Sequence, residues 1–355
     1  MSRFFSSKYS QLTPYTPGEQ PKDMKYIKLN TNESPYKPAK GVLDAARSEA
    51  EKLHLYSDPE CAQLTMALAN RYMVDKDEVL VTNGSDEILN FAFMAFCDSN
   101  RGIVFPDITY GFYPVFAELN NIPYKELPLR DDFTINVDDY VNARENVVIA
   151  NPNAPTGIAL TLDEIERIVK ASSQRVVIID EAYVDFGAES AVSLIHKYDN
   201  LLVTMTFSKS RSLAGGRVGF GIGSRELIRD LNTIKYSTNP YNVNRMSQAC
   251  GYAAIEADEY YMQNAREIIK TREFTAEALK GLGFEVLPSS ANFIFARSEK
   301  ISGEELYKEL KARGILIRHF KKEKIKDFNR ITIGTKSEME AFLNEVTKIL
   351  EAKGQ

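Results

Sequence analysis

The residue best suited to covalent chemistry in this sequence is Lys209, which follows an apolar run over 201–207 and precedes a glycine pair at 215–216. A lysine removed from water has a lowered pKa, and its free amine is a nucleophile that can form a Schiff base. Taken alone, the pattern is more typical of an ordinary lysine at the rim of a loop. The function of Lys209 therefore depends on which groups the rest of the chain places beside it.

Two other polar segments also follow apolar runs. Asp180 ends the run 176–179, and a carboxylate in apolar surroundings needs a cationic partner. Gly84 and Ser85 open a helix whose unpaired N–H groups favour an anion, and Asp86 is interpreted as the N-cap residue. A lysine, a carboxylate and an anion cradle at one edge of a sheet are the set that pyridoxal phosphate requires.

The elements that must position these residues alternate between strand-like and helical patterns. Helical patterns cover 40–52, 62–72, 86–96, 109–119 and 162–171. Strand-like apolar runs cover 78–82, 102–105, 123–129, 147–150, 175–179, 201–207 and 217–222. This alternation predicts an α/β fold with a mostly parallel seven-stranded sheet covered by helices on both faces. Ligands of such sheets lie beyond the carboxyl ends of the strands, where Lys209 and Asp180 fall.

The chain divides into three predicted parts. Residues 1–36 are rich in Pro, Tyr and Asn and predict an N-terminal arm, and 37–240 form a large cofactor-binding domain. Residues 241–355 predict a smaller α/β C-terminal domain, reached through a long helical pattern from 244 towards 282. Its strands are expected at 284–287, 292–296, 315–318 and 330–333, and its helices at 302–313 and 337–351.

The composition excludes several classes of function. The chain has 355 residues, 44% of them hydrophobic, and a formal charge of -5 without a long basic block, so nucleic acid is not an expected partner. The three cysteines and three histidines are scattered, which predicts neither a metal site nor a disulfide framework. No apolar run approaches membrane-spanning length, and we expect a cytoplasmic protein without a membrane partner.

Four motifs resemble those of the fold type I aminotransferases, which use pyridoxal 5'-phosphate. They are Asn-Pro-x-x-Pro-Thr-Gly at 151–157, Asp-Glu-Ala-Tyr at 180–183, Ser-Lys with Ala-Gly-x-Arg-x-Gly at 208–219, and Arg-Ile-Thr-Ile-Gly-Thr at 330–335. Segments 12–15 and 29–36, together with the turn at Tyr56, resemble the histidinol-phosphate aminotransferase group. That resemblance spans almost the whole chain. It implies interconversion of histidinol phosphate and 2-oxoglutarate with imidazole acetol phosphate and glutamate, in histidine biosynthesis.

The resemblance implies a role for each matching residue. Lys209 would bind the cofactor covalently, Asp180 would pair with its pyridinium nitrogen, and Tyr183 would donate to its phenolic oxygen. Tyr110 would stack on the ring. The remaining cofactor contacts, which centre on the phosphate, are implied for Gly84, Ser85, Asp86, Ser208 and Arg217, and for Tyr56 across a homodimer with shared active sites. Substrate contacts are implied for Tyr15, Asn32, Arg318 and Arg330, with Arg330 on the α-carboxylate and Arg318 and Tyr15 on the distal phosphate.

One position departs from the pattern of the resembled family. The residue before Pro-Thr-Gly is usually an Asn whose amide supports the phenolic oxygen of the cofactor, and here it is Ala154. Either Asn153 or Asn151 supplies an amide instead, or Tyr183 makes the contact alone. Asn153 is the amide that we assign to the cofactor.

Three alternative functions remain at this point. The nearest is an aromatic or broad-specificity aminotransferase. The second is a decarboxylase of an O-phospho amino acid such as threonine phosphate, which shares the fold and the cofactor. The third is a non-catalytic pyridoxal-binding module of a regulator, and the absence of a basic helix pair in the first residues argues against it.

Overall fold

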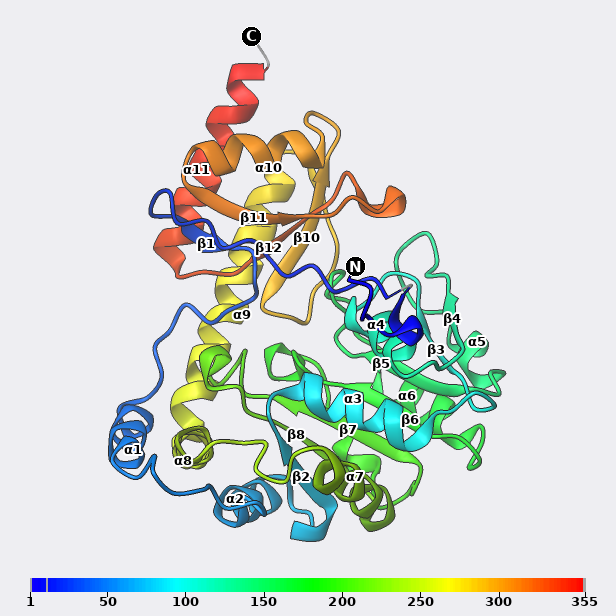
Figure 1. The fold of residues 1–355 in the computed structure, drawn as a ribbon. Coiled ribbons are helices and arrows are strands. Elements are labelled where there is room, and N and C mark those ends of the chain that lie inside the picture. Colours follow the sequence, from blue (N-terminus) through cyan, green and yellow to red (C-terminus); the bar gives the residue numbers. More distant parts are fainter. Residues whose placement is uncertain (1, 11, 354–355) are drawn as a thin grey trace.

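The computed structural model describes residues 2–10 and 12–353, and it is built on two β-sheets (Figure 1). The larger sheet has seven strands in the order β2-β8-β7-β6-β5-β3-β4, and β8 is antiparallel to both of its neighbours. The predicted mostly parallel seven-stranded sheet is thereby confirmed. Its strands are β2 (Val79–Thr82), β3 (Ile103–Pro106), β4 (Tyr124–Leu127), β5 (Asn146–Ala150), β6 (Val177–Asp180), β7 (Leu201–Thr206) and β8 (Gly219–Gly223).

Both faces of this sheet are buried, which explains the continuously apolar runs. Val147 and Ile149 of β5 belong to one hydrophobic cluster, whereas Val148 and Ala150 belong to the cluster on the opposite face. One face is covered by α3 (Ser85–Phe96), α4 (Phe112–Leu119) and α7 (Arg225–Thr238), and the other by α2 (Ala62–Tyr72), α6 (Leu162–Lys170) and α8 (Arg245–Glu256). The short α5 (Val137–Val141) packs on α6, and α1 (Lys40–Ala50) packs on α8.

Two features of the helices differ from the prediction. The helical pattern from 244 towards 282 is divided at Ala257 into α8 and α9 (Asp258–Gly281). The division follows from Asp258, which opens α9 with a carboxylate at the positive end of the helix dipole and pairs with buried Arg211 at 2.5 Å. The unpredicted helix α7 begins after Ser224, whose hydroxyl accepts the N–H of Leu227 as an N-cap.

The smaller sheet has the order β1-β11-β12-β10-β9 and combines both ends of the sequence. Strand β1 (Ile27–Leu29), from the predicted arm, pairs in parallel with β11 (Ile315–His319) (Figure 1). The other strands are β9 (Phe284–Val286), β10 (Phe293–Ser298) and β12 (Asn329–Thr332), and the helices are α9, α10 (Gly303–Ala312) and α11 (Lys336–Lys353).

The arm is thus part of the smaller sheet as well as a surface segment. The domain boundaries after 36 and 240 stay predictions, and residues 1, 11, 354 and 355 of the predicted parts lie outside the described residues. No helix within 2–10 and 12–353 is long and apolar enough to cross a lipid bilayer.

Candidate active site

Two adjoining cavities open at the carboxyl edge of the larger sheet. One has a volume of about 570 Å³ and the other about 200 Å³. Lys209 and Tyr183 line both cavities. The smaller cavity is also lined by Ser85, Asp86, Tyr110, Asp180, Ser208 and Arg217, and the larger by Tyr15, Asn32, Tyr110, Arg318 and Arg330. The structure therefore brings together most of the residues that the sequence assigned to the site.

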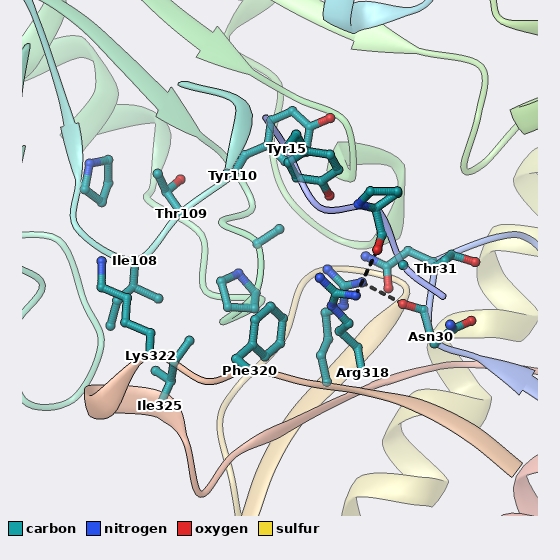
Figure 2. A pocket seen from close by; sticks show the side chains of 18 of the residues that line it. Tyr15, Asn30, Thr31, Ile108, Thr109, Tyr110, Arg318, Phe320, Lys322 and Ile325 are labelled. Atoms are coloured by element: carbon teal, nitrogen blue, oxygen red, sulfur yellow. Dashed lines mark hydrogen bonds between the residues drawn. The ribbon is translucent and has the colours of Figure 1, made fainter. Parts of the chain in front are cut away.

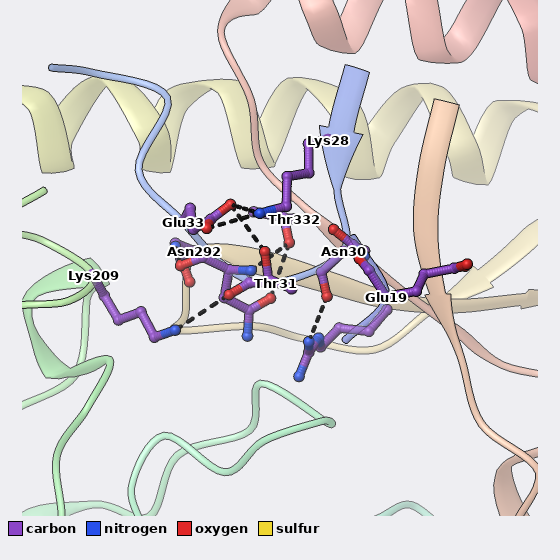
Figure 3. Close-up of polar contacts among 10 residues, drawn as sticks. Glu19, Lys28, Asn30, Thr31, Glu33, Lys209, Asn292 and Thr332 are labelled. Carbon is purple, nitrogen blue, oxygen red and sulfur yellow. Dashed lines mark hydrogen bonds and ion pairs between the residues drawn. The ribbon is translucent and has the colours of Figure 1, made fainter. Parts of the chain in front are cut away.

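Lys209 lies where the two cavities meet, shortly after β7 ends. Its Nζ donates to the backbone carbonyl of Thr31 at 3.3 Å (Figure 3). The same atom lies 5.8 Å from the centre of the Tyr183 ring. The single carbonyl is a weak anchor, so the amine is free to turn towards a ligand in either cavity. A half-buried amine in this position can react with a carbonyl group.

Asp180, the last residue of β6, forms the floor of the smaller cavity with 4% of its surface exposed. Its Oδ2 accepts from the hydroxyl of Tyr113 at 2.9 Å, and its Oδ1 accepts from Thr204 at 3.4 Å. Burial raises the pKa of Asp180 to about 6, while the Tyr113 hydrogen bond acts in the opposite direction. A cationic ring nitrogen would neutralise this buried carboxylate.

The anion cradle lies where β2 leads into α3. Gly84 has φ +81°, and a Cβ there would lie 2.5 Å from Nη2 of Arg217. A Cβ on Gly219 of β8 would lie 2.3 Å from the backbone nitrogen of Ser85, so the strand can approach the helix start only as glycine. Backbone N–H groups at the start of α3, a hydroxyl and a guanidinium form a set of donors that suits a phosphate.

Asp86 differs from its expected role as the N-cap. The N-cap position is occupied by Gly84, and α3 begins at Ser85, which places Asp86 inside the first turn. Its carboxylate accepts from the hydroxyl of Tyr110 at 2.6 Å and pairs with Arg217 at 3.1 Å. Burial raises the pKa of Tyr110, so Tyr110 stays a donor. Asp86 thereby orients both the aromatic ring and the guanidinium of the cradle.

The larger cavity is bounded by the aromatic rings of Tyr15 from the arm and of Tyr110 from the segment that precedes α4. Tyr15 stacks on Phe112 at 4.2 Å between ring centres and lies 6.2 Å from Tyr110. Figure 2 shows Tyr15 and Tyr110 opposite Arg318 and Phe320. Planar ligands can enter between these walls.

Two arginines form the opposite wall. Arg318 of β11 and Arg330 of β12 are direct cross-strand partners, and both guanidinium groups lie near the ring of Phe320, at 5.6 and 5.8 Å. Arg330 donates to the carbonyl of Asn30 at 2.9 Å, and its buried Nε has no partner among the described residues. Burial and the charge of Arg318 lower the pKa of Arg330. An anionic substrate would supply the missing acceptor and the counter-charge.

Arg318 is held only loosely. Its guanidinium donates to the carbonyls of Pro17 at 3.3 Å and of Thr16 at 3.4 Å, in the segment of the arm that crosses the cavity (Figure 2). Both distances lie at the long end of hydrogen bonding, so these donors can be transferred to a ligand.

Asn153 does not lie where we assigned it. Its amide donates to the carbonyl of Ile108 and to Thr156, both at 3.0 Å, and its Oδ1 accepts from Thr109 at 2.8 Å. The Asn151 amide donates to the backbone carbonyl of Leu160 at 3.4 Å and accepts from its N–H at 2.7 Å. Neither residue lines the smaller cavity, because both amides are already engaged by these partners, and that of Asn153 is bound chiefly by the segment 108–109. We therefore remove Asn153 from the candidate site.

Tyr56 lies outside this site. Tyr56 is 80% exposed, stacks on Tyr241 at 4.6 Å and lines neither cavity, so its role across a dimer stays a prediction.

In the described part of the chain, no group of three or more His, Cys, Asp or Glu side chains is arranged to hold a metal ion.

Sequence reasoning missed several residues that support the site. Tyr113 and Thr204 bind Asp180, and Thr332 binds Asn32. Tyr110 and Tyr113 are three residues apart within the predicted helix 109–119, and this was a usable signal because such residues share a helix face. In the structure Tyr113 lies in α4 and Tyr110 just before it. Thr332 follows Arg330 by two residues, which places both on the same face of a strand.

Comparisons with known proteins agree with this geometry. A family model described as aminotransferase class I and II matches residues 24–346, and the chain belongs to this family. Within the family, its relatives are named histidinol-phosphate aminotransferase. The protein of that name from Brachyspira hyodysenteriae is 49% identical over 353 residues, which cover 99% of this chain and 100% of that protein. The one from Clostridium beijerinckii is 48% identical over 351 residues, with coverage of 99% and 98%.

A solved structure confirms the fold. The crystal structure of histidinol-phosphate aminotransferase from Sinorhizobium meliloti in complex with pyridoxal-5'-phosphate matches with a TM-score of 0.84 and 22% identity, over 92% of each chain. At this level of identity the match bears on the fold alone.

Proposed function

We propose that this chain is a pyridoxal phosphate-dependent histidinol-phosphate aminotransferase of histidine biosynthesis. It would interconvert histidinol phosphate and 2-oxoglutarate with imidazole acetol phosphate and glutamate. The observation that carries the proposal is the placement of Lys209 between a cavity with a buried carboxylate and a cavity with paired arginines. Nearly full-length identity of 48–49% to proteins of that name supports the same substrates.

The residues of the smaller cavity fit the cofactor. When bound, pyridoxal phosphate supplies an electron-withdrawing ring that stabilises negative charge on the α carbon of the substrate. Asp180 would hold the proton on the ring nitrogen, and its own burial would be compensated by that cation. Arg217, Ser208 and the N–H groups at the start of α3 would hold the phosphate. Tyr110 would cover one face of the ring.

Lys209 would act twice. Its amine would hold the cofactor in the substrate-free enzyme. As a free amine it would also be the group that takes a proton from, or returns a proton to, the α carbon of the substrate. The nearby carbonyl of Thr31 would orient the ammonium form of Lys209.

The arginine pair would select anionic substrates. Arg330, whose buried Nε has no partner among the described residues, would bind the α-carboxylate of glutamate with a planar fork, and this would orient the bond that loses its proton. Arg318, beside Tyr15, would face the phosphate of histidinol phosphate or the distal carboxylate of glutamate. One guanidinium can serve both, because its donors match either anion.

The assembly and the location are part of the same proposal. We propose a homodimer in which Tyr56 reaches the cofactor phosphate of the neighbouring subunit, because this exposed tyrosine has no role in its own cavities. A cytoplasmic location is supported by Cys61, Cys97 and Cys250, which are free thiols. Analytical ultracentrifugation and cell fractionation test these two statements.

The test of function is a substrate panel with glutamate as the amino donor. Imidazole acetol phosphate should be converted with a kcat/KM at least about tenfold above that of aromatic keto acids. Preference for aromatic keto acids would show a different aminotransferase, and release of carbon dioxide from phosphothreonine would show a decarboxylase. Borohydride reduction followed by peptide mapping should place the cofactor on Lys209, and attachment elsewhere would refute the assignment.

A further inference from the structure

Tyr183 accepts a hydrogen bond from a residue of the arm. The amide nitrogen Nδ2 of Asn32 lies 2.9 Å from the Tyr183 hydroxyl oxygen. Asn32 is 1% exposed, whereas the tyrosine lines both cavities. Because this oxygen is the acceptor, the hydroxyl proton of Tyr183 is left to donate to another group, and none of the described residues accepts it.

The orientation of the Asn32 amide is set by Thr332. The backbone N–H of Asn32 donates to Oγ1 of Thr332 at 3.0 Å. That oxygen therefore directs its own proton elsewhere, and it donates to Oδ1 of Asn32, also at 3.0 Å. A reversed amide would place its NH₂ group against the Thr332 proton. The amide oxygen must face Thr332, and the amide nitrogen must face Tyr183.

The backbone holds this amide in place. Asn32 has φ 56°, in the left-handed region that asparagine tolerates better than most residues. Its carbonyl accepts from the amide of Asn292 at 3.0 Å (Figure 3). Three residues that lie 151, 260 and 300 positions from Asn32 in the sequence thus converge on it, which fixes the direction of each hydrogen bond.

The opposite wall of the cavity offers no competing amide. Ala154 presents a methyl group beside Tyr183. The amide of Asn151 is engaged with Leu160, and that of Asn153 with Ile108. The described lining of the smaller cavity contains no Asn or Gln, and the Tyr183 ring in that lining has its centre 5.8 Å from Nζ of Lys209.

We propose that Thr332, Asn32 and Tyr183 form a directional hydrogen-bond relay that presents the tyrosine proton to the phenolic oxygen of the cofactor, in the place of an amide at Ala154. Asn32 is then a positioning residue that acts through Tyr183 rather than a direct ligand of the substrate. The inference rests on the proposed pyridoxal phosphate function. Successive donors polarise one another, so Thr332 also strengthens the final bond.

The relay has a spectroscopic consequence. A donor to the phenolic oxygen withdraws charge from it, and the imine nitrogen linked to Lys209 then holds its proton less tightly. The relay therefore lowers the pH at which the lysine-bound cofactor loses that proton. The visible absorbance of the substrate-free holoenzyme reports this titration directly, without turnover.

Three substitutions test the relay in the holoenzyme. Asn32→Asp replaces the donor by an acceptor, so the Tyr183 proton turns away from the cofactor. The midpoint pH of the absorbance titration should then rise by about one pH unit or more. Asn32→Gly removes the amide without adding charge or straining the left-handed backbone, and Thr332→Val removes the first donor. Both should raise the midpoint, Thr332→Val by the smaller amount. Thr275→Val is the control, since Thr275 is a fully buried threonine of α9 that bonds within its own helix.

The outcomes separate the relay from the function on which it depends. If wild-type protein forms no borohydride-reducible bond at Lys209, the proposed function fails first. The relay is overturned if the wild-type holoenzyme titrates and the titration midpoints of Asn32→Gly and Thr332→Val equal those of wild type and of the control Thr275→Val. A shift confined to Asn32→Asp would show a simple effect of charge and would also overturn it.

Discussion

The hydroxyl of Tyr113 lies 2.9 Å from Oδ2 of Asp180 and donates to it inside the hydrophobic core. Tyr113 is fully buried in α4, and Asp180 is the last residue of β6, so the bond joins a helix to the sheet edge on which the cofactor site is built. Burial raises the pKa of Asp180, and this donor opposes the rise by stabilising the carboxylate. Tyr113 thereby keeps Asp180 available as a partner for a cationic ring.

Tyr113→Phe should weaken cofactor binding. Hydrogen bonds to charged groups contribute about 1.5–3 kcal/mol, so we expect the dissociation constant of pyridoxal phosphate to rise by about tenfold or more at pH 7. The loss should be larger at pH 6, because the pKa of Asp180 rises further and more of the carboxyl is protonated. Titration of the apoprotein with cofactor, followed by absorbance at pH 6, 7 and 8, measures both effects.

Tyr140→Phe is the matched control for this substitution. Tyr140 is 2% exposed, and its hydroxyl has no hydrogen-bond partner in the described part of the chain. It should bind cofactor as wild type does. Equal affinities of the two variants at all three pH values would show that the Tyr113 hydroxyl does not act on Asp180.

Glu181 should make the apoprotein less stable as the pH rises. Burial raises its pKa to about 8 from the ordinary 4.5, while Ser190 and the N–H of Ala191 donate to it. The folded state therefore keeps a proton that the unfolded chain loses, so stability falls between about pH 4.5 and about pH 8. Glu181→Gln should remove this part of the decline. Its free energy of unfolding should be similar to that of wild type at pH 5 and a few kcal/mol higher than that of wild type at pH 9.

Urea unfolding of apoprotein at pH 5, 7 and 9 measures the difference. Asp180 titrates in both proteins and leaves a common decline between about pH 3.8 and about pH 6. Glu340→Gln, an exposed substitution on α11, controls for the loss of a carboxylate at the surface. If the stability of Glu181→Gln falls with pH as steeply as that of wild type, Glu181 is already ionised in the folded protein.

The residues at the carboxyl edge could be predicted because their position follows from local pattern. Apolar runs buried on both faces can only be strands of a covered parallel sheet, so Asp180 and Lys209, which follow two neighbouring runs, had to lie together. The same logic failed at Ala257, where the apolar period is similar on both sides of the break. It also failed at Asp86, because a pattern does not define the first residue of a helix.

The supporting contacts could not be predicted because they join distant segments. Tyr113 and Asp180 are 67 residues apart, and Asn32 and Thr332 are 300 residues apart. The local sequence around each residue does not identify its partner. Tyr113 meets Asp180 only because α4 packs on the larger sheet, and Asn32 meets Thr332 only because the arm packs beside β12 of the smaller sheet. Asn153 was misplaced for the same reason, since its amide is bound by Ile108, 45 residues away, and by Thr109, 44 residues away.

Arg318→Ala should weaken both substrates together. Its guanidinium now holds two carbonyls of the arm at 3.3 and 3.4 Å, and an anion would replace these weak contacts by charge-assisted bonds. We expect kcat/KM for the phosphate ester and for glutamate to fall by about ten- to a hundredfold, mainly through KM. Arg313→Ala, which removes an exposed ion pair with Glu309, should leave both constants unchanged. Unchanged Michaelis constants in Arg318→Ala would exclude Arg318 from anion binding.

Hybrid dimers should show whether the active site is shared. Tyr56 is exposed and lines neither cavity of its own chain, so a contribution to catalysis requires a second copy. In a hybrid of Tyr56→Phe with Lys209→Ala, one site would combine an intact Lys209 with an intact Tyr56, and the other would carry both defects. Subunit exchange at a one-to-one ratio should then restore about a quarter of the wild-type activity at limiting cofactor, since half of the dimers are hybrids with one intact site.

The parental dimers set the baseline for this experiment. Lys209→Ala should bind cofactor without turnover, and Tyr56→Phe should need more cofactor for the same rate, because the phosphate loses one donor. If Tyr56 acted within its own chain, each site of the hybrid would keep one defect, and exchange would restore nothing. Activity of the mixture that stays at the mean of the two parents would therefore rule out a shared site and leave the Tyr56–Tyr241 stack as a surface contact.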